Sequence, residues 1–92
     1  MVTFFSLSGP KGIAIAPNGN VFIADTENHA IRMIDILTGM MQVVVGTGMP
    51  FDGADGDPRQ CGLSRPHGVF VRPDGKVLIG DSENHKIRIY IP

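Results

Sequence analysis

The sequence has few of the residues on which several common kinds of site depend. Among its 92 residues there is one cysteine, Cys61, one tyrosine and no tryptophan. A single cysteine excludes a disulfide within the chain and leaves no cysteine cluster for structural zinc. The scarcity of tryptophan and tyrosine leaves few rings on which nucleic-acid bases could stack. Cys61 is therefore interpreted as a buried or incidental thiol.

An excess of charge and a long hydrophobic run are also missing. The chain has eight Lys and Arg residues against nine Asp and Glu residues, so no strong field would attract nucleic acid or an anionic membrane surface. The apolar run 43–45 is far shorter than the roughly 18 residues that a membrane helix needs. Residues 1–7 lack the basic start and the long apolar stretch of a signal peptide. These absences predict a soluble, cytoplasmic protein without a membrane partner.

The sequence does contain an internal repeat with an offset of 56 residues. Residues 7–36 align without a gap on residues 63–92, and fourteen of the thirty positions are identical. Chance does not produce such a match over so long a register. The chain therefore contains two copies of one structural unit.

Each copy has the pattern of short antiparallel strands joined by tight turns. Apolar segments alternate with turns that contain Gly, Pro, Asn or Asp, the residues that accept turn geometry most easily. Strands are predicted at 12–16, 21–24, 30–36 and 41–46 and, in the second copy, at 68–72, 76–80 and 86–91. No stretch has the caps and periodicity of an amphipathic helix. Short strands in groups of four predict an all-β chain made of β-propeller blades.

The repeat resembles a known family. The first copy reads G-x-A-x-x-P-x-G-x-V-x-I-A-D-T-x-N-H-x-I-R, which is similar to the NHL repeat, named for an Asn-His-Leu-type motif. That motif is Asn28-His29-Ala30 here and Asn84-His85-Lys86 in the second copy, so its third letter departs from the family in both. The resemblance extends from Leu7 to Ile91. It implies two four-stranded antiparallel blades of a ring that typically has six, and it implies no particular function.

Two blades do not close a ring, so the organisation of the chain is informative. The prediction is a single propeller unit over 1–92, with a first blade at 12–46, a Gly- and Asp-rich linker at 47–62 and a second blade at 68–91. The second blade has three predicted strands, and residues 2–7 are predicted to be the outer strand of a neighbouring or last blade. Two interpretations stay open: the missing blades belong to a longer chain, or three copies join head to tail as a homotrimer of six blades.

Eight polar residues recur at equivalent positions of the two copies, and a residue repeated in every blade is expected to serve the blade itself. Each aspartate is expected to cap the turn that follows it. Each arginine is expected to form an ion pair with that aspartate or with the glutamate two residues later. The family resemblance implies that the histidines hydrogen-bond within or between blades. The residues are Asp25, Asn28, His29, Arg32, Asp81, Asn84, His85 and Arg88.

Four further residues are expected at the mouth of the central channel, where they could bind a ligand: Lys11, Arg65, His67 and Arg72. His67 lies in a Pro-His-Gly stretch that resembles one in peptidyl-hydroxyglycine amidating lyases, in which histidines of alternate blades bind zinc. The resemblance implies a zinc ligand, which three copies of the chain could supply. The preferred interpretation is that Pro-His-Gly belongs to the repeat.

The aspartates of the linker invite comparison with a calcium loop. Asp52, Asp55 and Asp57 are separated by glycine and alanine, but the segment lacks the ligand order of an EF-hand and its terminal glutamate. A flexible, solvated loop is preferred. No cofactor is therefore predicted, and zinc and calcium remain the alternatives.

The predicted function is a binding or scaffolding module for a protein or small ligand, because propellers present loops around a channel. The chain contains no convincing nucleophile–base pair, phosphate loop or metal cluster, so no catalytic residue is assigned and a non-enzyme is favoured. Two alternatives remain. One is part of a metal-dependent lyase or hydrolase with its site at His67. The other is an RNA-binding surface, although nucleic acid is not the preferred partner.

Overall fold

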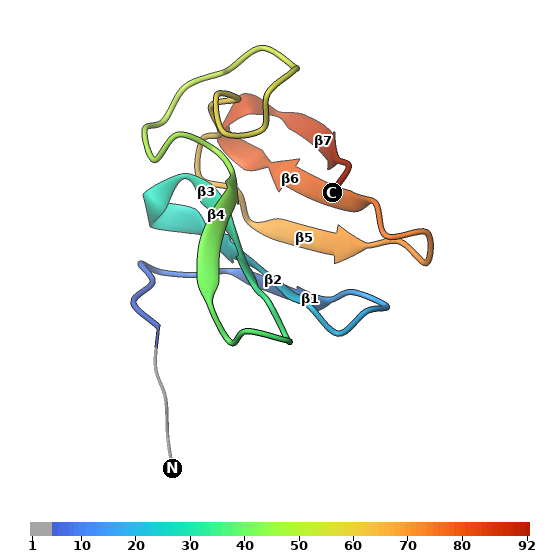
Figure 1. Cartoon of the computed structure of the whole chain (residues 1–92). Helices are drawn as coiled ribbons and strands as arrows, with labels where there is room; N and C mark the ends of the chain where they lie inside the picture. The colour runs from blue at the N-terminus through green and yellow to red at the C-terminus, as the bar shows by residue number, and fades with distance from the viewer. Residues whose placement is uncertain (1–4) are drawn as a thin grey trace.

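The computed structural model describes residues 5–92, which form two antiparallel β-sheets (Figure 1). The first sheet has the order β1-β2-β3-β4, and the second has the order β5-β6-β7. The strands are β1 (Gly12–Ile15), β2 (Val21–Asp25), β3 (Ala30–Ile34), β4 (Met41–Val45), β5 (Gly68–Val71), β6 (Val77–Asp81) and β7 (Lys86–Tyr90). The strand order follows the chain order, as it does in a blade of consecutive hairpins. The prediction of an all-β chain is confirmed.

All seven predicted strands are present, and most are shorter than expected. β3 ends at Ile34 instead of residue 36, because Asp35 begins a tight turn in which its backbone N–H and carbonyl bond Met40 and Gly39. Of the predicted outer strand at 2–7, residues 2–4 lie outside the described residues, and residues 5–7 are not in a strand. Within the described residues, no helix is long and apolar enough to cross a membrane.

The turns between the second and third strands of each sheet are one-turn 3₁₀ helices, η1 (Thr26–Asn28) and η2 (Ser82–Asn84). Each ends at a histidine in the left-handed conformation, with φ of 53° at His29 and 56° at His85. Such a φ is uncommon for a residue other than glycine, although histidine and asparagine adopt it more readily than most. The predicted turns are thus present as one-turn 3₁₀ helices, each closed by a histidine in the left-handed conformation.

The hydrophobic core lies between the two sheets. It contains Phe22, Ala24 and Ile31 from the first sheet and Val77 and Ile79 from the second, all of them buried. Leu63, in the segment that leads into the second sheet, is 0% exposed and belongs to the same cluster. The ring of Phe22 meets that of Tyr90 edge to face, with centroids 6.5 Å apart, an arrangement that aromatic pairs prefer. One face of each sheet is therefore buried against the other.

Candidate functional site

The junction between the two sheets combines the hydrophobic core with hydrogen bonds from one sheet to the other. The hydroxyl of Thr26 donates a 2.7 Å hydrogen bond to the carbonyl of Pro66. The backbone N–H of Arg65 donates to Nδ1 of His29 at 3.0 Å. This second bond confirms the expectation that His29 bonds between blades. The turn of one blade therefore grips the entry segment of the next.

A close approach of the first strands of the two sheets, β1 and β5, completes this junction. β1 and β5 lie side by side. A Cβ atom added at Gly12 would lie 2.6 Å from the carbonyl oxygen of His67, a separation that real side chains do not tolerate. Gly12 does not have a positive φ, so its backbone conformation does not require glycine. The close contact between the two sheets does require it.

Each sheet has one face buried in the junction and a second face that is exposed. Because the two sheets are copies of one repeat, each exposed face resembles the face that the other sheet buries. The face of the second sheet that packs on the first carries Val69 and Val71, and the equivalent residues of the first sheet, Ile13 and Ile15, are each 70% exposed. Conversely, Ile31 is 0% exposed in the junction, and its equivalent Ile87 is 71% exposed. The outer faces of the two sheets thus repeat the two halves of the buried junction. Their large exposed hydrophobic side chains are Ile13, Ile15, Phe70, Ile87 and Ile89.

Two buried aspartates organise the blades. Asp25 is 0% exposed and accepts hydrogen bonds from the Ser8 N–H at 2.8 Å, from the Asn28 side-chain amide at 2.9 Å and from Nε of Arg32 at 2.9 Å. Asp81 accepts the same three bonds from Ser64, Asn84 and Arg88, at 2.8, 2.9 and 2.8 Å. Of the two predicted partners, aspartate or glutamate, each arginine pairs with its aspartate.

The prediction that these aspartates cap the following turns is wrong. Neither carboxylate bonds a backbone N–H of the 3₁₀ helix that follows it. The backbone N–H that Asp25 accepts belongs to Ser8, seventeen residues earlier. The carboxylate is instead occupied by three other donors, the Ser8 N–H, the Asn28 amide and the guanidinium of Arg32, and the last of these adds a charged partner that a turn N–H does not provide.

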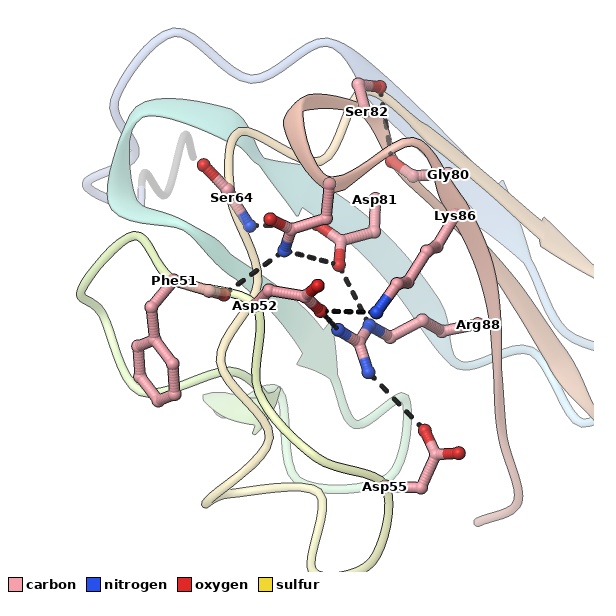
Figure 2. Close-up of polar contacts among 10 residues, drawn as sticks. Phe51, Asp52, Asp55, Ser64, Gly80, Asp81, Ser82, Lys86 and Arg88 are labelled. Atoms are coloured by element: carbon pink, nitrogen blue, oxygen red, sulfur yellow. Dashed lines mark hydrogen bonds and ion pairs between the residues drawn. The ribbon is translucent and has the colours of Figure 1, made fainter.

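The linker at 47–62 folds back onto β7 and adds carboxylates to Arg88. Asp52 accepts bonds from Nζ of Lys86 at 2.6 Å and from Nη2 of Arg88 at 2.8 Å, and Asp55 lies 3.4 Å from Nη1. Figure 2 shows these groups converging on the guanidinium. The bonds to Lys86, together with Arg88, hold the pKa of Asp52 below its ordinary value. Burial works against the charge of Arg88, but the bond to Asp81 and the other carboxylates raise its pKa overall.

These contacts anchor part of the linker, although most of its residues are exposed, as expected of a solvated loop. Gly53 and Cys61 are buried, and Cys61, as predicted, is a buried thiol, with its pKa raised by burial. The Asp52–Arg88 pair, which holds the linker on β7, was not predicted from the sequence. Its signal was Lys86, where the first copy has Ala30, which places an extra cation opposite an acidic linker.

The four residues expected at the channel mouth have different partners. Arg65 bridges Glu27 at 3.0 Å and Glu83 at 3.2 Å. Its hydrogen bond to Glu27 lowers the pKa of that carboxyl and raises the pKa of Arg65. Arg72 pairs with Asp74 at 3.0 Å and follows the end of β5, so it lies at the opposite end of that strand from His67 and does not share one mouth with it. Lys11 and His67 are exposed at the entries of β1 and β5. Within the described residues no hydrogen bond joins the four side chains to one another.

The zinc prediction at His67 is not tested by one chain. Across residues 5–92, no three side chains of the His, Cys, Asp or Glu type are grouped so as to hold a metal ion. A zinc site at His67 would therefore need ligands from other blades, and it stays a prediction.

Two hollows lie beside the outer strands. One, of about 920 Å³, is lined by residues 86–91 of the β7 edge and by linker residues such as Asp55, Pro58 and Cys61. The other, of about 480 Å³, lies beside β3 and β4 and is lined by Asn28, Arg32 and Arg59 among others. Both are at the outer side of a blade, where a ligand or further chain could enter.

Comparisons with known proteins agree with this architecture. A model of the NHL repeat matches residues 7–32 and 63–90. The protein SUPPRESSOR OF QUENCHING 1 of Arabidopsis thaliana is 30% identical over 82 residues, which are 89% of this chain and 8% of that protein. NHL repeat-containing protein 2 of Bos taurus is 41% identical over 81 residues, 84% of this chain and 11% of that protein.

The fold also has a counterpart among solved structures. A protein of unknown function from Bacteroides thetaiotaomicron superposes with a TM-score of 0.81 at 26% identity, over 88% of this chain and 20% of that one. This chain therefore spans about a tenth of the length of the two curated relatives and a fifth of the solved chain.

Proposed function

The chain belongs to the NHL repeat family, and from that premise we propose that it is a propeller-type binding and scaffolding module whose two open sheet faces each take up another blade. One observation carries the proposal. The exposed faces carry apolar side chains, Ile13, Ile15 and Ile87, at the positions equivalent to Val69, Val71 and Ile31 in the junction between its own sheets. Apolar side chains as exposed as Ile13 and Ile87 are typical of surfaces that a partner covers.

We propose that the partner is a second copy of this chain, bound head to tail. Shifted by 56 residues, the bond from Arg65 N–H to His29 becomes a bond from Gly9 N–H of one copy to His85 of the other. Gly9 has a positive φ of 53°, close to the 44° of Arg65, so the entry segment already has the required shape. A contact of this heterologous kind closes when its rotation permits, and three copies would give six blades. Blades of the same family in a longer chain would use the same faces.

The outer edge of β7 is suited to receive the fourth strand of its blade. β3 pairs with β4 from Ile31 to Ile34, whereas within the described residues β7 pairs with β6 alone. The hollow of about 920 Å³ runs along this edge. An extended segment there would bond the free backbone groups by strand addition. We propose residues 2–7 of a neighbouring copy as that segment.

The solution mass of the chain tests the assembly. A ring predicts a species of three times the 9.9 kDa of one chain. Gly68→Ala is the sharpest variant, because a Cβ there meets nothing within 4 Å in one chain. In a ring it would meet the Lys11 carbonyl of the next copy, as a Cβ at Gly12 would meet that of His67. We expect Gly68→Ala to fold normally and to lose the assembled species.

The control for this experiment is Leu37→Ala, a change of an exposed side chain in the turn between β3 and β4, which is 92% exposed and lies outside the strands. It should keep the assembly. A wild-type chain that stays monomeric at every concentration would contradict the self-assembly and leave the blades of a longer chain as the partner.

A ring with β1 and β5 innermost would repeat Lys11 and His67 at one end of its axis, because they precede these strands, and Arg72 at the other end, because it follows β5. We propose the exposed Lys11 and His67 as the ligand surface of the module, for a protein loop or a small polar ligand. Three His67 imidazoles are the group that zinc would require. Metal analysis of the assembled species tests this, and a metal-free assembly that does not take up zinc would remove the metal enzyme as an alternative.

A further inference from the structure

The two equivalent arginines of the repeat are not equally satisfied. Arg88 donates to three carboxylates, those of Asp81, Asp52 and Asp55, and its side chain is 8% exposed. Arg32 donates from Nε to Asp25, and its side chain is 25% exposed. Within the described residues no other carboxylate reaches Arg32. Both guanidinium groups bond a buried aspartate through Nε. Only Arg88 also has carboxylate partners for its two terminal nitrogens, Nη1 and Nη2.

The neighbouring groups differ in the same way. The side-chain amide of Asn84 donates both to Asp81 and, at 3.1 Å, to the backbone carbonyl of Phe51 in the linker. Asn28 donates only to Asp25 among the described residues. The carbonyl of Leu63 accepts the Phe51 N–H at 3.4 Å, and Leu63 is fully buried. Its equivalent, Leu7, is half-buried and has no such bond within residues 5–92.

The positions that the linker occupies beside Arg88 are open beside Arg32. A hollow of about 480 Å³ lies there, bordered by Asn28, Arg32, Arg59 and Gln60. Two arginines and no carboxylate line it. Arginine forks bind carboxylates in a bidentate, charge-assisted manner, so the hollow has the charge and the donors for an acidic group.

We propose that this hollow is a binding site for an extended acidic segment of the Asp-Gly-x-Asp type, the type that residues 52–55 provide at Arg88. The ligand's aspartates would take the outer nitrogens of Arg32. Its backbone would bond Asn28 and Leu7, as that of Phe51 bonds Asn84 and Leu63. Ala30 replaces Lys86 in this copy, so one cation of the occupied site is missing, and Arg59 supplies a positive charge from the linker side.

The site does not depend on the proposed ring. The linker of a second copy is already engaged with its own Arg88, so head-to-tail assembly alone would not fill it. A failure of self-assembly and a failure of this site are therefore separate results.

The test uses the whole isotope-labelled chain and a synthetic peptide with the sequence of residues 49–57, Met-Pro-Phe-Asp-Gly-Ala-Asp-Gly-Asp. We expect saturable changes in the NMR signals of the Arg32 Nε–H and of the Asn28 side-chain amide. The equivalent signals of Arg88 and Asn84 are the internal control. They should stay in place, because the protein's own linker already occupies them.

Two comparisons decide whether the carboxylates carry the binding. The same peptide with asparagine for the aspartates that correspond to Asp52 and Asp55 should bind about tenfold more weakly or worse, since bonds to charged groups are the stronger ones. Arg32→Lys keeps a cation beside Asp25 but removes the fork, and it should weaken binding similarly. The proposal is overturned if the acidic peptide leaves Arg32 unmoved, if the asparagine peptide binds equally well, or if inorganic phosphate at the same concentration gives the same changes.

Discussion

Arg32 and Arg88 occupy equivalent positions. Replacing each with methionine separates the pairing with a buried aspartate, which both have, from the contacts with the linker, which only Arg88 has. Either change leaves a fully buried aspartate without its charged partner. Removing one member of a buried pair costs about 3–5 kcal/mol, at the lower end here because each aspartate keeps two neutral donors. Urea unfolding should therefore show a loss of about 3 kcal/mol for both variants. A loss confined to one of them would contradict the equivalence of the two networks.

The two variants should differ in the linker. Arg88→Met also removes the partner of Asp52 and Asp55, so the amides of residues 51–55 should exchange with solvent faster. Arg32→Met should leave their exchange unchanged, since no linker carboxylate touches Arg32 within the described residues. Equal acceleration in both variants would mean that the linker follows global stability and is not held by Arg88.

Acid should release the linker through Asp52. The pKa of Asp52 is lower in the folded chain than its ordinary value of about 3.9. Its contribution to stability is therefore present at neutral pH and is lost as the pH falls through the lowered pKa. We expect the NMR signals of residues 51–55 to shift toward those of a free loop below about pH 4. In Asp52→Asn those signals should already lie near the free-loop position, with little further change in acid.

At the scale of elements, the two innermost glycines provide a matched pair. Gly12→Ala would force a Cβ against the His67 carbonyl and separate β1 from β5. We expect it to destabilise the chain by about 1–3 kcal/mol, the usual cost of overpacking. Gly68→Ala meets open space and should leave stability equal or slightly higher, because alanine restricts the unfolded chain. Thermal unfolding measures both, and equal stabilities would contradict the close contact.

The strands and the repeat were predictable from the sequence, while the contacts of the site were predictable only in part. Alternating apolar residues and Gly-containing turns are local signals, so β1 to β7 lie where they were expected. The Asp25–Arg32 pair lies across one hairpin and was also expected. The Asp52–Arg88 pair joins residues 36 positions apart, and it depends on how the linker folds back. No local pattern encodes that path. The cap at Asp25 was mispredicted because its carboxylate accepts from Arg32, Asn28 and the distant Ser8, and the contact with Ser8 is not visible in the local sequence.

At the scale of the whole molecule, the two outer faces can be blocked one at a time. A chain with Ile13→Glu keeps its second-sheet face, and a chain with Ile87→Glu keeps its first-sheet face. Each face bears a charge that a partner's apolar face would have to desolvate, so each variant alone should stay monomeric. An equimolar mixture should form a two-chain species of twice the mass, measured by light scattering. A mixture that remains monomeric would contradict the complementarity of the faces.

Arg65, which bridges Glu27 and Glu83, has a consequence for symmetry. Its equivalent is Gly9, which has no side chain to form such a bridge. In a ring of three copies, the seams within chains would thus carry an ionic clasp, and the seams between chains would not. Strong and weak seams would alternate around the axis, so the ring would have three-fold and not six-fold symmetry. Such a ring would always break at the same three places, returning intact blade pairs.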